Sequence, residues 1–132
     1  MTREEYDQYL LSFNGKDYSR VLEYWAPEFE VIVQGQLLFN SPETLIKTYG
    51  FLHDRVKEEV FVQSFLSDKD KIFMEAIVRI TAKQTITAED LERENINGIM
   101  PINEGDVVDI PQFIHYHLEH GKFKKGVCLV NF

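Results

Sequence analysis

The chain contains 132 residues, of which 44% are hydrophobic and 13% aromatic, and at this size a core can be buried without a disulfide or a metal ion. Aspartate and glutamate outnumber lysine and arginine by 22 to 14, which gives a net charge of −8. Such a charge argues against nucleic acid and anionic membranes as partners, because both are bound through lysine and arginine. The single cysteine, Cys128, rules out an internal disulfide, and the acidic N-terminus lacks a signal-peptide pattern, so we expect a cytoplasmic protein.

Two helices are predicted in the first part of the chain. The first spans residues 2–13, where Thr2 and Glu5 match a capping box. Its apolar face has helical spacing and consists of Tyr6, Tyr9, Leu10 and Phe13. The second helix begins after Asp17 and is predicted to end at Pro27. Its apolar side consists of Tyr18, Val21, Leu22 and Trp25.

A strand, a helix and a hairpin follow. Residues 29–33 are rich in β-branched side chains and predict a strand that ends at Gly35. Ser41-Pro42 begins a helix that runs to about residue 56. The helix carries the apolar residues Leu45, Ile46, Tyr49 and Leu52, and His53 points inward if it continues the face of Tyr49. Strands over residues 58–66 and 71–82, joined by a polar turn, predict a β-hairpin.

The last third combines an irregular segment with a second hairpin. Residues 83–105 show no sustained period, and loops of this length inside compact domains are usually functional or mobile. Thr87 is expected to cap one helical turn within them. Strands over residues 106–119 and 122–132 form the hairpin. Helices early and antiparallel strands late predict one α+β domain over residues 1–132, with three helices packed on a strongly curved antiparallel sheet.

Four segments in this order resemble the nuclear transport factor 2-like superfamily, and within it the SnoaL-like and ketosteroid-isomerase-like branch. Residues 9–17 read Tyr-Leu-Leu-Ser-Phe-Asn-Gly-Lys-Asp and are similar to the family's short Asn-x-Gly-Asp turn. The other segments are residues 21–29, residues 41–50 and residues 113–122, the last of which is similar to the family's final hairpin. The resemblance implies a cone-shaped fold around an apolar small-molecule pocket.

Members of the superfamily include isomerases, polyketide-type cyclases, dehydratases, epoxide hydrolases and plain binding modules, so the resemblance does not choose a reaction. Tyr9 falls where ketosteroid isomerases have the tyrosine that hydrogen-bonds the enolate oxygen. Their general-base aspartate would fall near Val33 and their second oxyanion-hole acid near Ile114, and neither residue can exchange a proton. The comparison therefore argues against ketosteroid isomerase chemistry as such.

One face of the predicted strand 106–119 carries His115, His117 and Glu119, two residues apart. This pattern could ligate a metal ion. The opposite face is apolar enough to be the buried concave side and consists of Val108, Ile110, Gln112, Ile114, Tyr116 and Leu118. The histidines would then lie on the convex face, which many members of the superfamily use to dimerise. We favour this interpretation over a metal site, and we expect a homodimer.

The leading hypothesis is a cofactor-free isomerase, cyclase or dehydratase (lyase) of the SnoaL-like kind that acts on an apolar, oxygenated small molecule. Such chemistry needs a pocket that excludes water, one proton acceptor and one hydrogen-bond donor. We expect the acceptor to be His53 or Asp54, and the donor to be Tyr9 or Tyr116. The substrate-binding wall is expected to consist of Trp25, Tyr49, Gln112 and Ile114.

These candidates have structural alternatives. Tyr116 is equally well explained as a core residue with a satisfied hydroxyl. His53 is also explained as a partly exposed histidine that the helix dipole stabilises. For the whole chain, the alternative is a non-catalytic small-ligand-binding or dimerisation module of the same fold, which the absence of the family's base aspartate favours.

Overall fold

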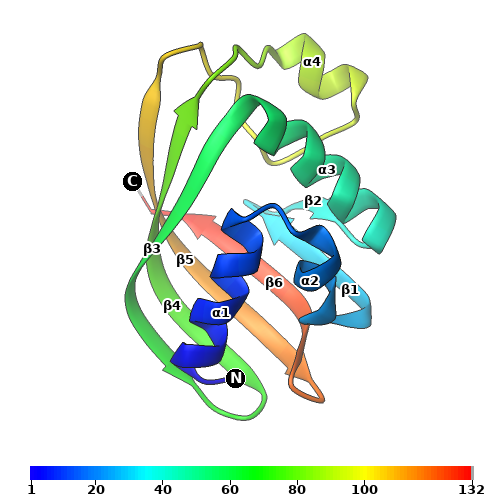
Figure 1. Ribbon diagram of the computed structural model, residues 1–132, viewed down its shortest axis with the longest axis vertical. Coiled ribbons are helices and arrows are strands. Elements are labelled where there is room, and N and C mark those ends of the chain that lie inside the picture. Colours follow the sequence, from blue (N-terminus) through cyan, green and yellow to red (C-terminus); the bar gives the residue numbers. More distant parts are fainter. Residues whose placement is uncertain (132) are drawn as a thin grey trace.

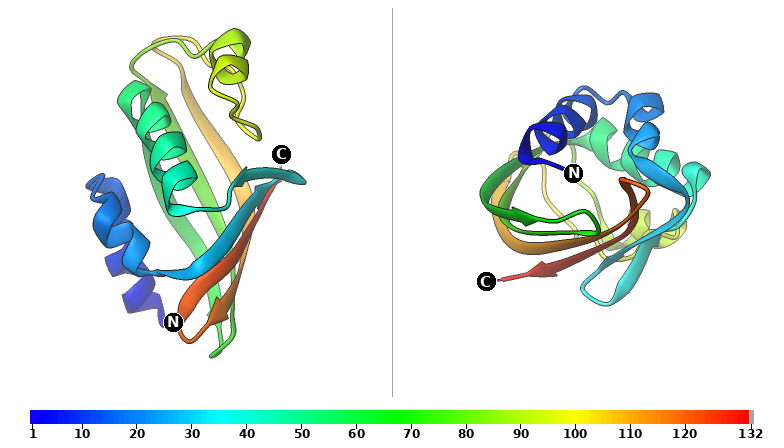
Figure 2. Two further views of the ribbon diagram at one scale, coloured as in Figure 1. Left: turned by 90° about the vertical axis from the view of Figure 1, so that its right-hand side faces the viewer. Right: turned by 90° about the horizontal axis from the view of Figure 1, so that it is seen from below.

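The computed structural model describes residues 1–131 and contains a six-stranded sheet with the strand order β2-β1-β6-β5-β4-β3. The sheet is strongly curved, and three helices lie on its concave side (Figures 1 and 2). These three are α1 (Arg3–Asn14), α2 (Tyr18–Glu23) and α3 (Pro42–Arg55), and a fourth helix, α4 (Ala88–Arg93), lies in the segment 83–105. The strands are β1 (Trp25–Val33), β2 (Gln36–Phe39), β3 (Val56–Ser67), β4 (Lys71–Ala82), β5 (Val107–Glu119) and β6 (Lys122–Val130). No helix among residues 1–131 is long and apolar enough to cross a membrane.

The second helix ends earlier than the sequence predicts. α2 stops at Glu23, and Trp25 opens β1 where the helix was expected to continue to Pro27. The backbone N–H of Phe123 donates to the carbonyl of Tyr24 over 2.8 Å, so contact with β6 begins at this point. The strand pairing, which is long-range in sequence, thus overrides the local helical spacing.

The sheet is mixed, whereas the sequence predicted a wholly antiparallel one. The hairpins β3–β4 and β5–β6 are confirmed, but β1 pairs with β6 in parallel. The short strand β2 was not predicted and returns from β1 through Gln34 and Gly35, whose φ angles are 51° and 78°. Such turns favour Asn-Gly or Asp-Gly, so Gln-Gly is a weak sequence signal. β6 ends at Val130, and its predicted end, Phe132, lies outside the described residues.

The segment 83–105 is packed more closely than its irregular sequence suggests. Thr87 caps α4 with a full capping box, as expected. Ile86 and Ile102 form an isolated antiparallel bridge that closes the segment on itself. Its apolar side chains pack against the end of α3 in a small second core, which consists of Phe51, Leu52, Val56, Ala82, Ile86, Leu91 and Ile96. The segment therefore buries one side of α3.

The space between α1 and the sheet is filled by aromatic rings. We call this cluster the aromatic interior, and its members are Tyr6, Tyr9, Trp25, Phe29, Phe39, Tyr116 and Phe123. The ring of Phe123 lies at its centre, 4.4 Å from the ring of Tyr116 and 4.9 Å from that of Tyr9. The hydroxyls of Tyr6 and Tyr116 are hydrogen-bonded to each other at 3.1 Å. The polar atoms of these two tyrosines are thus satisfied inside the core.

The face assignment of β5 is confirmed over half of its length. Ile114, Tyr116 and Leu118 are buried on the concave side, and His115 and His117 lie on the opposite face. Val108, which the alternation placed on the same buried side, is 37% exposed. The covered part of β5 is therefore shorter than its apolar pattern predicts.

Candidate functional site

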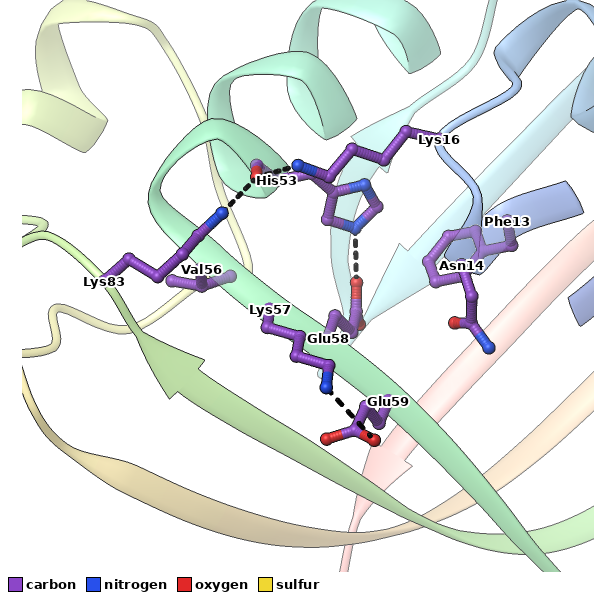
Figure 3. Close-up of a pocket in the computed structure, with 9 residues that line it drawn as sticks. All are labelled: Phe13, Asn14, Lys16, His53, Val56, Lys57, Glu58, Glu59 and Lys83. Carbon is purple, nitrogen blue, oxygen red and sulfur yellow. Dashed lines mark hydrogen bonds and ion pairs between the residues drawn. The ribbon is translucent and has the colours of Figure 1, made fainter. Parts of the chain in front are cut away.

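A cavity of about 340 Å³ lies where the end of α1, the end of α3 and the start of β3 meet (Figure 3). It is open to solvent, and five of its nine lining residues are charged. Its lining consists of Phe13, Asn14, Lys16, His53, Val56, Lys57, Glu58, Glu59 and Lys83. The wall combines proton-transfer groups with hydrogen-bond donors, which is the requirement for acid–base chemistry.

His53 is held in the last turn of α3 with both ring nitrogens paired. The helix starts at the Ser41 cap, and helical spacing places His53 one turn after Tyr49 on the inward face. The imidazole stacks on the ring of Tyr49, with centroids 5.2 Å apart and planes 7° apart, and its side chain is 4% exposed. The inward orientation of His53 that the sequence allowed is thus what the structure shows, and the alternative of a partly exposed histidine is wrong.

Glu58 is the partner of His53 and was not predicted. His53 Nε2 and Glu58 Oε1 are 2.9 Å apart. Glu58 shares the inward face of β3 with Val56, Val60 and Val62, because side chains two residues apart point the same way. A carboxylate in phase with three valines was the sequence signal for an inward acid. The side chain of Glu58 is 15% exposed, so it is the member of the pair that solvent reaches.

The hydroxyl of Tyr18 completes the environment of His53. It lies 2.9 Å from His53 Nδ1 and 3.2 Å from the carbonyl oxygen of Tyr49. When Nδ1 is unprotonated, the hydroxyl can donate to it. When Nδ1 carries a proton, the ring can donate to the hydroxyl, which then donates to the carbonyl. Burial, with the nearby carboxylates of Asp54 and Glu58, raises the pKa of Tyr18 to about 12, so it stays a neutral donor.

Two lysines converge on the end of α3. Lys16 Nζ donates to the carbonyl oxygen of His53 over 2.8 Å, and Lys83 Nζ donates to the same oxygen over 3.5 Å. The last carbonyls of a helix lack partners within the helix, so these ammonium groups satisfy one of them. A third lysine of the wall, Lys57, is 3.8 Å from the carboxylate of Glu59.

Of the residues predicted for the site, only His53 lines this cavity. Tyr49 stacks on its ring, whereas Asp54 is exposed on the outer side of α3. The other candidates are not among the lining residues: Tyr9, Trp25 and Tyr116 belong to the aromatic interior, and Gln112 and Ile114 lie on β5. Burial raises the pKa of both Tyr9 and Tyr116, so these hydroxyls stay neutral in the core. The structure does not bring these tyrosines into the same wall as His53, because their rings build the core instead.

The histidines of β5 lie on the convex face. The ring of His115 stacks on Phe73 at 4.0 Å and approaches the ring of His117 at 4.3 Å. His115 Nε2 is buried without a hydrogen-bond partner, and burial lowers the pKa of this histidine. Among residues 1–131, no group of three His, Cys, Asp or Glu side chains is arranged to hold a metal ion.

No family model matches the sequence, and no curated protein matches it. Its backbone is similar to that of an NTF2-like protein of unknown function from Burkholderia pseudomallei, with a TM-score of 0.71 and 12% identity over 99% of this chain and 92% of that one. A SnoaL-like polyketide cyclase from Agrobacterium tumefaciens gives a TM-score of 0.70 and 15% identity over 96% and 87% of the two chains. An LEH-like epoxide hydrolase from M. tuberculosis gives a TM-score of 0.67 and 10% identity over 93% of this chain and 77% of that one.

At these identities the likeness concerns the backbone, and the roles of single residues do not transfer with it. The likeness covers nearly the whole chain and agrees with the curved sheet and the helices on its concave side. The cone-shaped α+β architecture that the sequence predicts is thereby confirmed: the chain has the nuclear transport factor 2-like fold.

Proposed function

We propose that this chain is an enzyme that moves a proton on an oxygenated small molecule, with Glu58 as the proton acceptor. The observation that carries the proposal is the hydrogen bond of 2.9 Å between His53 and Glu58 in the wall of an open cavity. The reaction class is that of the SnoaL-like enzymes, namely isomerisation, cyclisation or dehydration. Proton transfer of this kind needs a positioned acid–base group and a donor for the developing oxyanion. The cavity offers both, but it is open to solvent and is not the water-excluding pocket that the sequence predicts.

In the proposed step, the second carboxylate oxygen of Glu58 takes a proton from a carbon next to a substrate carbonyl. The electron pair of the broken C–H bond forms a carbon–carbon double bond, and the π pair of the carbonyl moves onto its oxygen, to which the side-chain amide of Asn14 can donate a hydrogen bond. Glu58 then returns the proton to a different carbon in an isomerisation. In a dehydration it gives the proton to a departing hydroxyl group, which leaves as water.

His53 acts in this scheme as a positioning residue. Its Nε2–H holds one oxygen of Glu58 (Figure 3), which leaves the other oxygen of this cavity-lining carboxylate to take the proton. Tyr18 fixes the ring from the other side and satisfies Nδ1 in either protonation state. The sequence suggested His53 as the proton acceptor. We assign this role to Glu58 instead, because the imidazole of His53 is almost fully buried and both of its nitrogens are hydrogen-bonded.

Glu58→Gln tests the proposal, because the amide keeps the shape of the side chain and removes the base. We would follow deuterium exchange at carbons next to the carbonyl in D₂O by NMR, for a panel of small ketones, enones and oxo acids. The wild-type protein should accelerate exchange for at least one compound, and the variant should be slower by about 100-fold, the usual contribution of a general base. Glu104→Gln, an equal charge change at an exposed position outside the sheet, is the control. If Glu58→Gln exchanges every compound of the panel at the same rate as the wild type, the assignment of Glu58 as the base is wrong.

The second candidate function is a non-catalytic ligand-binding module. The filled aromatic interior favours it, because the side chains predicted to line a pocket there pack against one another instead. This alternative predicts that compounds bind in the cavity without exchange, and that Glu58→Gln changes their affinity but no rate.

We also propose that the chain forms a homodimer through the convex face of the sheet. Three helices cover the concave face, whereas the convex face carries large apolar side chains that are 41% to 74% exposed: Phe61, Leu66, Phe73, Phe113 and Leu129. Several large exposed apolar side chains on one sheet face are uncommon on monomers, and a twofold axis lets one such face bury its own copy.

Light scattering after size exclusion tests the proposed dimer. Phe73→Lys with Phe113→Lys should give a monomer, and Met100→Lys, a similar change at a 75% exposed site outside the sheet, should not. A wild-type protein that stays monomeric at high concentration contradicts the interface.

A further inference from the structure

Two ammonium groups at the cavity have no carboxylate partner. Among residues 1–131, Lys16 and Lys83 form no ion pair, whereas Lys57 is paired with Glu59. Glu58, the remaining acid of the wall, is hydrogen-bonded to His53. In a chain with a net charge of −8, one cavity thus holds two unpaired positive charges.

The two lysines come from segments that are far apart in the sequence. Lys16 lies in the turn between α1 and α2, with a φ of 57°, and Lys83 follows the last residue of β4. The backbone N–H of Lys83 donates to the carbonyl of Arg55 over 2.8 Å, which fixes this segment against the end of α3. Figure 3 shows both side chains directed to the carbonyl of His53 from opposite sides. Their nitrogens are therefore at most 6.3 Å apart (2.8 Å plus 3.5 Å).

The two lysine ammonium groups keep free N–H donors after they have hydrogen-bonded to the carbonyl of His53. An ammonium group has three N–H donors, and each of the two lysines donates to one acceptor among residues 1–131. The remaining donors lie at the wall of the cavity, where Glu58 supplies one negative charge. Two positive charges beside one negative charge leave a net charge of +1 at the wall, which a ligand group with a single negative charge neutralises and a dianion overcompensates.

We propose that the substrate is a small organic carboxylate whose carboxyl group is bound between Lys16 and Lys83. Each carboxylate oxygen then accepts a charge-assisted hydrogen bond from one ammonium group. A volume of about 340 Å³ is at the lower end of the range for ligand pockets, which fits a molecule of one ring or a short chain. The inference rests on the proposed function in one respect: the carbon that loses its proton to Glu58 belongs to this carboxylate.

Binding of benzoate tests the proposal without turnover. We would titrate the ¹⁵N-labelled protein with benzoate, with the neutral isostere benzamide and with sulfate at low salt. Benzoate should shift the amide signals of Lys16, Val56 and Lys83, and it should bind more tightly than either other probe. Lys16→Met with Lys83→Met should weaken benzoate at least about tenfold, the effect of losing one charge-assisted hydrogen bond. Lys69→Met with Lys122→Met, the same loss of two charges at exposed positions of the two hairpins, should leave the affinity unchanged.

Because both lysines also satisfy the end of α3, Lys16→Arg with Lys83→Arg serves as the charge-preserving variant and should retain benzoate binding. Equal affinity for benzamide and benzoate overturns the proposal, and so does an unchanged affinity in the double Met variant. Sulfate binding as tight as that of benzoate shows a site for inorganic anions and overturns the organic carboxylate. Glu58→Gln should bind benzoate at least as well as the wild type, since a repulsive charge is removed. Benzoate binding without any exchange activity would reject the base role of Glu58 and keep the carboxylate site.

Discussion

The aromatic interior and the cavity at the end of α3 are built on opposite principles. In the interior, rings contact rings and the two hydroxyls of Tyr6 and Tyr116 satisfy each other. At the cavity, a histidine and a carboxylate interrupt two apolar faces, those of α3 and β3, and face each other within 2.9 Å. Burying a charged group is unfavourable unless it is paired, so the second arrangement is not what packing alone would select. The aromatic interior therefore stabilises the fold, whereas the buried polar pair at the cavity carries a desolvation cost.

The largest effect is expected in the interior. Phe123→Ala removes a ring that is 0% exposed and that contacts the rings of Tyr9, Trp25 and Tyr116. The free energy of unfolding should fall by about 3–5 kcal/mol, since the transfer term and the cavity term add. Urea denaturation followed by circular dichroism measures this value. Leu11→Ala, at a 65% exposed position of α1, is the control and should change stability by less than about 0.5 kcal/mol. Similar values for the two variants would show that the rings do not form one packed core.

The interior also shows which part of the fold the sequence predicts well. Its residues repeat with the period of the element that carries them, so the inward faces of α1 and of the second half of β5 follow directly from the apolar pattern. Trp25 is the exception, because its spacing fits a helix and only the pairing of β1 with β6 makes it part of a strand. The parallel pairing itself leaves no local signal, since it joins residues about a hundred positions apart.

The second largest effect is expected at the cavity, where removing one polar side chain should destabilise the fold more than removing both. Glu58→Leu leaves the Nε2–H of buried His53 without an acceptor, so we expect a loss of about 1–3 kcal/mol in the free energy of unfolding. The double variant His53→Leu with Glu58→Leu should recover most of this loss, because well-packed apolar residues often replace a buried polar pair without cost. A double-mutant cycle by urea denaturation measures the coupling. If the double variant is less stable than Glu58→Leu, the pair is a structural link between α3 and β3, and the contrast with the interior fails.

The cavity was harder to predict from the sequence for the same reason. Its polar groups are single exceptions in apolar patterns, and a single exception is equally compatible with a surface position. His53 was recognised because it follows the inward face of Tyr49, but Glu58 stands beside Lys57 and Glu59 and is easily taken for part of a solvated strand start. Tyr18 was assigned to the apolar side of α2, and only the structure shows that its hydroxyl reaches Nδ1 of His53. The inward phase of Glu58 with Val56, Val60 and Val62 was the one usable signal.

The smallest effect concerns His115. Its buried Nε2 has no hydrogen-bond partner among the described residues, whereas both ring nitrogens of His53 are hydrogen-bonded. Burial, followed by the positive charges of His117, Lys71 and Lys125, lowers the pKa of His115 below its ordinary value of 6.5. As the pH falls below 6.5, the unfolded chain therefore binds the proton before the folded chain does, and the free energy of unfolding decreases through this range. The effect should be modest, because the ring is only partly buried and solvent screens its charge.

His115→Gln removes this titration while keeping a polar side chain on the convex face. Thermal unfolding of the two proteins at about pH 7.5 and about pH 5 should show a larger decrease in Tm for the wild type, and carboxylates common to both proteins cancel in the difference. If the convex face is also buried in a dimer, the wild-type dimer should dissociate more readily at the lower pH than that of the variant. Identical pH dependence of the two proteins would mean that His115 takes up its proton as easily in the folded chain as in the unfolded one. The unpaired nitrogen would then have no energetic consequence, and pairing would not be what distinguishes His53 from the other histidines.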